Sequence, residues 1–397
     1  MTSHQATKAA TMLQTLFLPL LTSALLLSSP AAHAGWDEGV AAHEAKNYAL
    51  ALQEFRPLAE QGDRRAQRAL GVMYRLGQGV AKDDRVAVTW YRKAADQGLA
   101  NAQYTLGLML ANGQGVAKDE RAAVTWYRKA AEQGDFGAQF ELGLMLDTGR
   151  GVAKDEREAA SWYRKAAEQG DESAQFNLAL MLDSGRGVTK DEREAVTWYR
   201  KSAEQGYVAA QNNLGNAYEH GTGARQDFVE AARWYEAAAR TGNAWGQRNV
   251  GRLLRKGQGV AQNLVQAHAW LNLAASMDEP HPDAAAERDA LAAELTPAQL
   301  ADAQRLAREW KPGAAMGATR VKVAAAPAPA LKAVAAATNT GSYPPAPAAR
   351  PGVVTCSTRC NNGDCYRTYA DGRKTHFQAQ QKYNPLNNQW EFDAGGC

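Results

Sequence analysis

A strict 36-residue periodicity constrains the fold of this 397-residue chain more than any other feature of its sequence. Tryptophan recurs at this spacing at Trp90, Trp126, Trp162, Trp198, Trp234 and Trp270, and glutamine at Gln67, Gln103, Gln139, Gln175, Gln211 and Gln247. Glycine pairs, from Gly77/Gly79 to Gly257/Gly259, keep the same register. A fixed period of about 20–50 residues is typical of an array of one supersecondary unit. The sequence therefore predicts six repeats over residues 63–278.

Each repeat has the pattern of two helices joined by a glycine-rich turn. In the second repeat, apolar residues from Ala102 to Leu110 fall at helical spacing, and Asn112–Gly115 ends this first helix, because glycine readily adopts the left-handed C-cap conformation. Asp119 stands at the N-cap of the second helix, which carries Trp126 and Tyr127 on its apolar side. One hairpin cannot bury such a face alone, so neighbouring hairpins are expected to stack into an all-α solenoid.

The repeat unit resembles a known family. Its pattern, A-Q-x3-G-x5-G-x-G-V-x2-D-x6-W-Y-x2-A-A-x2-G, is similar to the Sel1-like repeat, a relative of the tetratricopeptide repeat. The resemblance covers 63–278 and implies a right-handed α-solenoid of antiparallel helix hairpins that acts as an adaptor scaffold, often exported in bacteria. Residues 35–62 are interpreted as a shorter N-terminal capping hairpin, and 279–310 as C-terminal capping helices.

The N-terminus has the pattern of a secretory signal. The apolar run Met12–Leu27 is short for a membrane span of about 20 residues, and Ala32-His33-Ala34 supplies a small-residue cleavage site. We interpret 1–34 as a signal peptide, with an uncleaved anchor as the alternative. The protein is then expected to be exported, either periplasmic or secreted, with no integral membrane segment after cleavage.

The C-terminal part differs in composition from the repeats. Residues 311–352 are rich in alanine and proline and contain no acidic residue, which is typical of an exposed linker. In 353–397, alternating segments around Asp371-Gly372 predict a β-hairpin within a small β-rich module. The four cysteines of the chain lie here: Cys356, Cys360, Cys365 and Cys397. In an exported chain they predict two disulfides with three open pairings, since their spacing does not fit a zinc site.

Neither composition nor motifs indicate catalysis or nucleic-acid binding. The 45 basic and 42 acidic residues give a net charge of +3, too balanced for a polyanion-binding protein. Histidines are scattered, no nucleophile or phosphate-binding motif occurs, and the recurring glycines are interpreted as inter-helix turns. We therefore expect no enzyme activity, no cofactor and no metal.

Two alternatives to a scaffold stay open. Cysteine-rich relatives of this repeat have been linked to penicillin binding or weak β-lactamase activity, although the repeats here contain no cysteine. The other alternative is cell-envelope adhesion through the C-terminal module.

The first helix of each repeat supplies the candidate binding site. In tetratricopeptide-type arrays the concave wall comes from first-helix positions that lie between packing residues. These positions are Tyr104, Leu108, Phe140, Leu144, Asp147, Phe176, Leu180, Asp183, Asn212, Asn216 and Glu219, called here the first-helix face. Aromatic side chains beside acids suit an extended basic peptide or protein segment, bound by a monomeric scaffold. The alternative is that the aromatic residues only pack between adjacent helices.

Overall fold

A computed structural model describes residues 30–276 and 280–316 and, as backbone, five strands between residues 356 and 393. Residues 1–29 of the predicted signal peptide, most of the predicted linker and the cysteine side chains lie outside the described residues. The chain divides into two compact units. One contains residues up to Ala94 together with the strands, and the other runs from Ala95 through the remaining helices.

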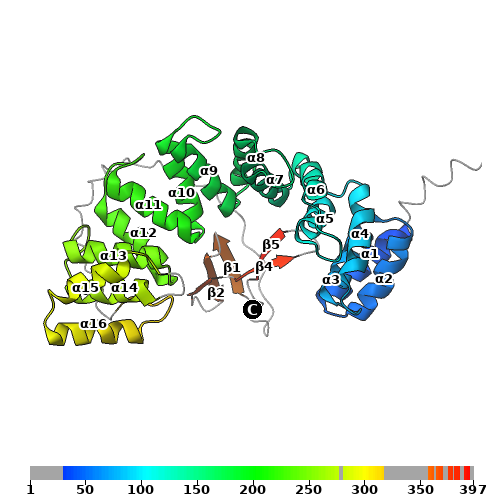
Figure 1. The fold of residues 1–397 in the computed structure, drawn as a ribbon. Helices are drawn as coiled ribbons and strands as arrows, with labels where there is room; N and C mark the ends of the chain where they lie inside the picture. The colour runs from blue at the N-terminus through cyan, green and yellow to red at the C-terminus, as the bar shows by residue number, and fades with distance from the viewer. Residues whose placement is uncertain are drawn as a thin grey trace, which may run out of the picture. The chain divides into compact units, whose positions relative to one another are not determined.

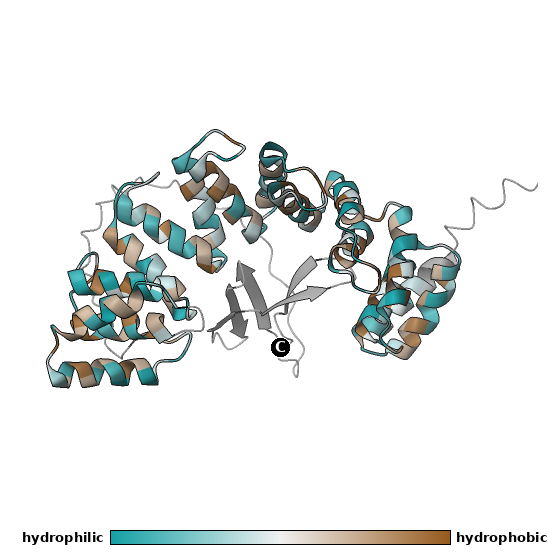
Figure 2. Cartoon of the chain, in the orientation of Figure 1, coloured by the Kyte–Doolittle hydropathy of each residue, from teal (hydrophilic) through white to brown (hydrophobic). Residues whose placement is uncertain are grey.

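The described residues contain sixteen helices, drawn in Figure 1. They are α1 (Pro30–Glu44), α2 (Tyr48–Glu60), α3 (Arg64–Leu76), α4 (Asp84–Asp96), α5 (Ala100–Asn112), α6 (Glu120–Glu132), α7 (Phe136–Thr148), α8 (Glu156–Glu168), α9 (Glu172–Ser184), α10 (Glu192–Glu204), α11 (Val208–His220), α12 (Phe228–Arg240), α13 (Ala244–Lys256), α14 (Leu264–Ser276), α15 (Ala284–Ala292) and α16 (Pro297–Glu309). Each repeat consists of one odd-numbered and one even-numbered helix, from α3/α4 to α13/α14. Figure 2 shows hydrophilic and hydrophobic segments alternating along these helices, as expected for amphipathic elements that stack.

The predicted helix caps are confirmed. The Asp119 carboxylate accepts a hydrogen bond of 2.9 Å from the backbone N–H of Ala122 at the start of α6. Gly113 ends α5 with φ of 68°, in the left-handed region. In the last repeat Asn263 replaces the aspartate and still accepts a 3.0 Å hydrogen bond from the Gln266 N–H. In each repeat, the glycine that ends the first helix and the Asp or Asn that caps the second therefore define the ends of the hairpin's two helices.

Within a repeat, the two helices pack through a tyrosine against a glycine. Tyr127 of α6 is fully buried, and a Cβ added to Gly107 of α5 would lie 2.6 Å from the Tyr127 ring. This confirms the prediction that Gly107 allows the helices a close approach. The fourth repeat carries Ala179 at this position, opposite Tyr199, so a methyl group is accommodated in that hairpin.

The periodic glutamines join consecutive repeats. Gln139 of α7 donates a 3.1 Å hydrogen bond to the backbone carbonyl of Ala131 at the end of α6, in the preceding repeat, and its own carbonyl accepts one of 2.8 Å from Gln169 at the end of α8, in the same repeat. Matching bonds join Gln133 to Gln103 and Gln205 to Gln175. The Ala131 carbonyl also accepts a 3.0 Å hydrogen bond from the Gly134 N–H, so the glutamine adds a second hydrogen bond at the end of α6 and ties it to α7.

The second glycine of each pair also lies at a joint between repeats. Gly187 has φ of 67°, and a Cβ built on it would overlap the backbone oxygen of Glu156, the first residue of α8. Gly151, Gly223 and Gly259 approach Glu120, Glu192 and Phe228 in the same way. The two glycines of the motif thus have different roles: the first ends a helix, and the second allows contact with the preceding repeat.

The repeats are flanked by helices on both sides. In the N-terminal unit α1 and α2 pair, with Phe55 fully buried and its ring 5.2 Å from that of Trp36. The helix α1 begins at Pro30, so the predicted mature start at Gly35 falls inside it. After the last repeat, α15 and α16 pack on α14, and Trp310 lies edge-on to Trp270.

The C-terminal strands form two antiparallel groups. The strands β1 (Cys356–Asn361), β2 (Asp364–Tyr369) and β3 (Lys374–Gln378) pair in that order, and β4 (Gln380–Asn384) pairs with β5 (Gln389–Asp393). The β2–β3 pairing encloses the predicted Asp371-Gly372 turn. Cys360 and Cys365 are opposite one another in the β1–β2 backbone register.

Candidate functional site

The aromatic side chains of the first-helix face lie between helices. Ring centroids are 6.1 Å apart for Tyr104 and Tyr127, and a Cβ on Gly137 of the next first helix would lie 2.9 Å from the Tyr104 ring. Phe140 and Phe176 pack in the same way, 5.9 and 6.0 Å from Tyr163 and Tyr199. The rings are half-buried rather than fully exposed. Packing thus accounts for part of each aromatic surface, as the alternative interpretation expected.

The acidic positions of the face differ from one another. Asp147 pairs with Arg186 from the turn of the next repeat, with Nη1 and Oδ1 3.0 Å apart, and its side chain is 13% exposed. The structure corrects the prediction for Glu219, which is only 5% exposed, is bound by Arg252 and accepts a 2.9 Å hydrogen bond from the Tyr235 hydroxyl. Glu219 is therefore a structural link within the array. Among the ion pairs of the described residues, none includes Asp183.

The leucine and asparagine positions are more open. Leu108, Leu144 and Leu180 are half-buried, and Asn216 is exposed. Asn212 donates a 2.8 Å hydrogen bond to Asn243 of the next repeat, so it belongs to a joint. Of the predicted set, the three leucines, Asn216 and Asp183 are thus partly or fully exposed and take part in none of the ion pairs or ring contacts described above.

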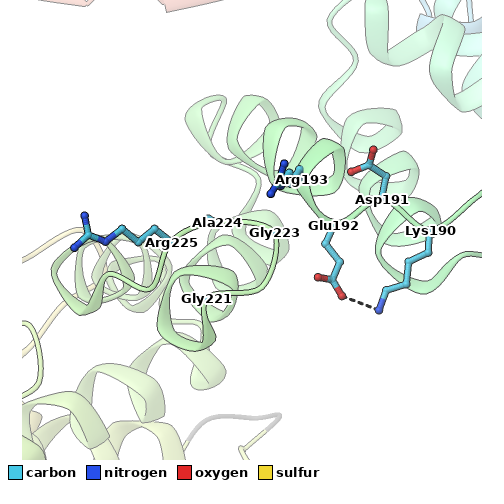
Figure 3. A pocket seen from close by; sticks show the side chains of 8 residues that line it. All are labelled: Lys190, Asp191, Glu192, Arg193, Gly221, Gly223, Ala224 and Arg225. Carbon is cyan, nitrogen blue, oxygen red and sulfur yellow. Dashed lines mark ion pairs between the residues drawn. The ribbon is translucent and has the colours of Figure 1, made fainter.

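A polar cavity of about 660 Å³ opens beside the fourth and fifth repeats. It is lined by Lys190, Asp191, Glu192, Arg193, Gly221, Gly223, Ala224 and Arg225. Figure 3 shows the Glu192 carboxylate facing Lys190, 2.7 Å from the ammonium group. Within the described residues no group of three His, Cys, Asp or Glu side chains is arranged to hold a metal ion, and no helix is both long and apolar enough to cross a bilayer.

Comparison with known protein families identifies the array. The family described as Sel1 repeat matches residues 64–99, 100–135, 137–171, 172–207, 208–243 and 246–279, together more than half of the chain. The chain belongs to the Sel1 repeat family. Proteins of this family are in general non-catalytic scaffolds for protein interactions, so the Sel1 repeats point to protein partners.

Solved Sel1 repeat structures support this assignment. A Sel1 repeat protein from Oxalobacter formigenes is 36% identical, with a TM-score of 0.54 and coverage of 64% of this chain and 100% of that one. The protein c5321, a protective antigen present in uropathogenic Escherichia coli strains, is 33% identical, with a TM-score of 0.51 and coverage of 70% and 68%. The comparison with curated proteins finds no match.

The second helices of the Sel1 repeats carry a network that the sequence analysis missed. The Trp162 ring is covered by the Lys165 ammonium at 3.8 Å, and its Nε1–H donates a 3.1 Å hydrogen bond to Glu158. Glu158 in turn pairs with Arg128 of the preceding repeat. The same set recurs at Trp198, Lys201, Glu194 and Arg164. Lysine follows tryptophan by three residues in four consecutive repeats, at Lys93, Lys129, Lys165 and Lys201, which was the available signal.

The Glu219 link gives the Sel1 array a predicted response to acid. Burial raises the pKa of the Glu219 carboxyl, but the hydrogen bond and charge of Arg252 and the Tyr235 hydroxyl hold it below its usual 4.5. A carboxyl with a lowered pKa in the folded state stabilises that state above about pH 4.5, and this contribution is lost as pH falls through the folded-state pKa. We expect Glu219→Gln to lower the free energy of unfolding by about 2 kcal/mol at pH 7, because Arg252 loses its carboxylate.

The measurement is denaturant unfolding of both proteins between pH 7 and pH 3. The difference in unfolding free energy between them should shrink below about pH 4.5. Glu204→Gln, at an exposed position at the end of α10, is the matched control and should give a small difference at every pH. A difference for Glu219→Gln that stays constant down to pH 3 would contradict this role.

Proposed function

We propose that this protein is a non-catalytic protein–protein interaction scaffold of the bacterial cell envelope, which binds a peptide or protein segment along its first-helix face. Its membership of the Sel1 repeat family supports the scaffold role. The signal-like pattern of residues 1–34 and the cysteine cluster near the C-terminus support export. In this proposal the Ala/Pro-rich segment is a spacer, and 353–397 is a disulfide-stabilised module that does not itself bind the partner.

The observation that carries the proposal is a contrast between the two faces of the array. On the second helices, long polar side chains already contact one another: Lys165 covers Trp162, and Glu158 is paired with Arg128. On the first helices of three consecutive repeats, Leu108, Leu144 and Leu180 are half-exposed, and the nearby Asp183 has no ion-pair partner among the described residues. Binding a ligand there costs little, because few existing contacts must be broken, and apolar anchors with nearby charge give affinity and register.

Site-specific photocrosslinking in the producing cells tests this function. A benzophenone amino acid is placed at Leu144 or Leu180 on the first-helix face, and at the exposed positions Ser161 or Thr197 on second helices as matched controls. We expect one protein to be cross-linked from Leu144 and Leu180 and not from the controls, and to bind the purified full-length chain. Equal capture from both faces, or none from the first-helix face, would refute the proposal.

A further inference from the structure

One joint between repeats has a cavity where the preceding joint has an arginine. The cavity has a volume of about 220 Å³ and lies between α9, α10 and α11. It is lined by Asp183, Glu192, Ala195, Val196, Tyr199, Asn213, Asn216, Ala217 and Thr222. Two carboxylates, two carboxamides and a buried tyrosine thus surround a space that no basic side chain lines.

In the preceding joint, an arginine occupies the equivalent space. Subtracting one repeat from Asp183 and Glu192 gives Asp147 and Glu156. There, Arg186 contacts both carboxylates, with Nη1 3.0 Å from Asp147 and 3.7 Å from Glu156. The position that matches Arg186 in the next repeat is Thr222, which is too short to reach them. Both joints therefore contain an equivalent pair of acidic residues, but only the preceding joint contains the arginine that contacts both of them.

Two further differences between the joints enlarge the cavity. Leu180 and Met181 in the filled joint correspond to Asn216 and Ala217 in the open one. Both replacements are smaller, and one adds a carboxamide whose oxygen can accept a hydrogen bond. Asn216, Ala217 and Thr222 all line the cavity, and each is smaller than its equivalent in the filled joint. The polar groups that are left can accept hydrogen bonds from a guanidinium, which has five N–H donors.

We propose that the cavity between Asp183 and Glu192 is a socket for an arginine side chain of the protein partner. This inference rests on the proposed scaffold function and specifies which side chain of the partner the first-helix face recognises. The arginine donates to Asp183 and Glu192 as Arg186 does to Asp147 and Glu156, and Asn213 and Asn216 line the path of its side chain. A charged, partly buried pair of this kind gives specificity for arginine over neutral side chains.

The neighbouring basic residues do not fill the socket. Lys190 pairs with Glu192 at 2.7 Å, but Lys154 pairs with Glu156 at 2.8 Å in the filled joint, where Arg186 is also present. The lysine is therefore compatible with an arginine. Arg225, on the turn beside the cavity, extends away from Glu192 in Figure 3.

The test uses the purified full-length chain and a pair of fluorescent peptides. One peptide has a single arginine flanked by glycine and serine, and the other has citrulline, its neutral isostere, in place of arginine. Fluorescence anisotropy at low ionic strength measures both dissociation constants. We expect the arginine peptide to bind at least about tenfold more tightly, and Asp183→Asn to weaken it about tenfold, a loss of one charge-assisted contact. Glu204→Gln, the same charge change at an exposed position, should alter affinity less than about twofold.

A filled-socket variant provides the strongest test. Thr222→Arg restores the residue of the preceding repeat, so it should abolish peptide binding and raise the unfolding midpoint. Thr222→Gln is the control, because other repeats carry glutamine at this position, as Gln114 and Gln258. It should retain binding within about twofold. Circular dichroism establishes that each variant is folded.

Several results would overturn the socket. These are equal binding of both peptides, no measurable binding to the unmodified chain, unchanged affinity in Asp183→Asn, or retained binding in a folded Thr222→Arg. Binding that appears only after Arg225→Gln would mean that the chain's own arginine occupies the cavity. The crosslinking at Leu144 and Leu180 is independent of the socket, so its success together with failure of the peptide test would refute the socket alone.

Discussion

Gly187→Ala is expected to destabilise the protein by at least about 3 kcal/mol, combining left-handed backbone strain with overpacking. Gly187 has φ of 67°, and its Cβ would lie under 3.0 Å from the Glu156 backbone oxygen, closer than real Cβ atoms approach. The neighbour is backbone at the start of α8, so no side chain can rotate away. The joint between two repeats must therefore open, which denaturant unfolding followed by circular dichroism would measure.

Gly170→Ala separates the two causes. Gly170 also has a positive φ, of 100°, but no atom lies within 4 Å of a Cβ at this position. Its substitution should cost only the backbone strain, about 1–2 kcal/mol. Equal losses for the two variants would mean that the close approach at Gly187 contributes nothing to the joint.

Trp162→Ala is expected to lower the unfolding free energy by about 3–5 kcal/mol, the usual range for a buried aromatic residue. Trp162 is 7% exposed, supports the Lys165 ammonium and donates to Glu158, which binds Arg128 of the preceding repeat. Its loss therefore weakens one repeat and one joint together, and the unfolding transition should become broader as well as earlier.

The control for this substitution is Trp245→Ala. The Trp245 side chain is 56% exposed, so its removal should change the unfolding free energy by less than about 1 kcal/mol. An unchanged transition in Trp162→Ala would show that the tryptophan column is not structural.

The helix hairpins could be predicted because local residues determine them. Asp119 caps a helix and Gly113 ends one whatever the neighbouring repeat contains, and the 36-residue spacing places each pair in register. Gly107 against Tyr127 could be predicted because a large and a small residue recur together. The joint contacts were harder to predict, since Arg128 and Glu158 are 30 residues apart, an offset that periodicity alone does not reveal.

In the candidate site, too, contacts between repeats could not be predicted from the sequence. Asp147 and Asp183 occupy one sequence column and were assigned one role, yet Arg186 covers the first and no arginine covers the second. Glu219 continues the column with one more methylene and reaches the buried Tyr235 hydroxyl. Whether an acid in this column is available depends on a residue from the next repeat, 39 positions further along the chain in the case of Asp147.

The joints between repeats use constant sequence offsets, and this has a consequence for how such a gene can change. Arg128 with Glu158 and Arg164 with Glu194 each span 30 residues, less than one period. Duplication or excision of a 36-codon block leaves these offsets intact at the new boundary, so the encoded array can lengthen or shorten by whole repeats without redesign of its joints. A copied block would also carry its own version of the Arg186 or Thr222 position, so recombination alone can multiply, move or erase an open joint.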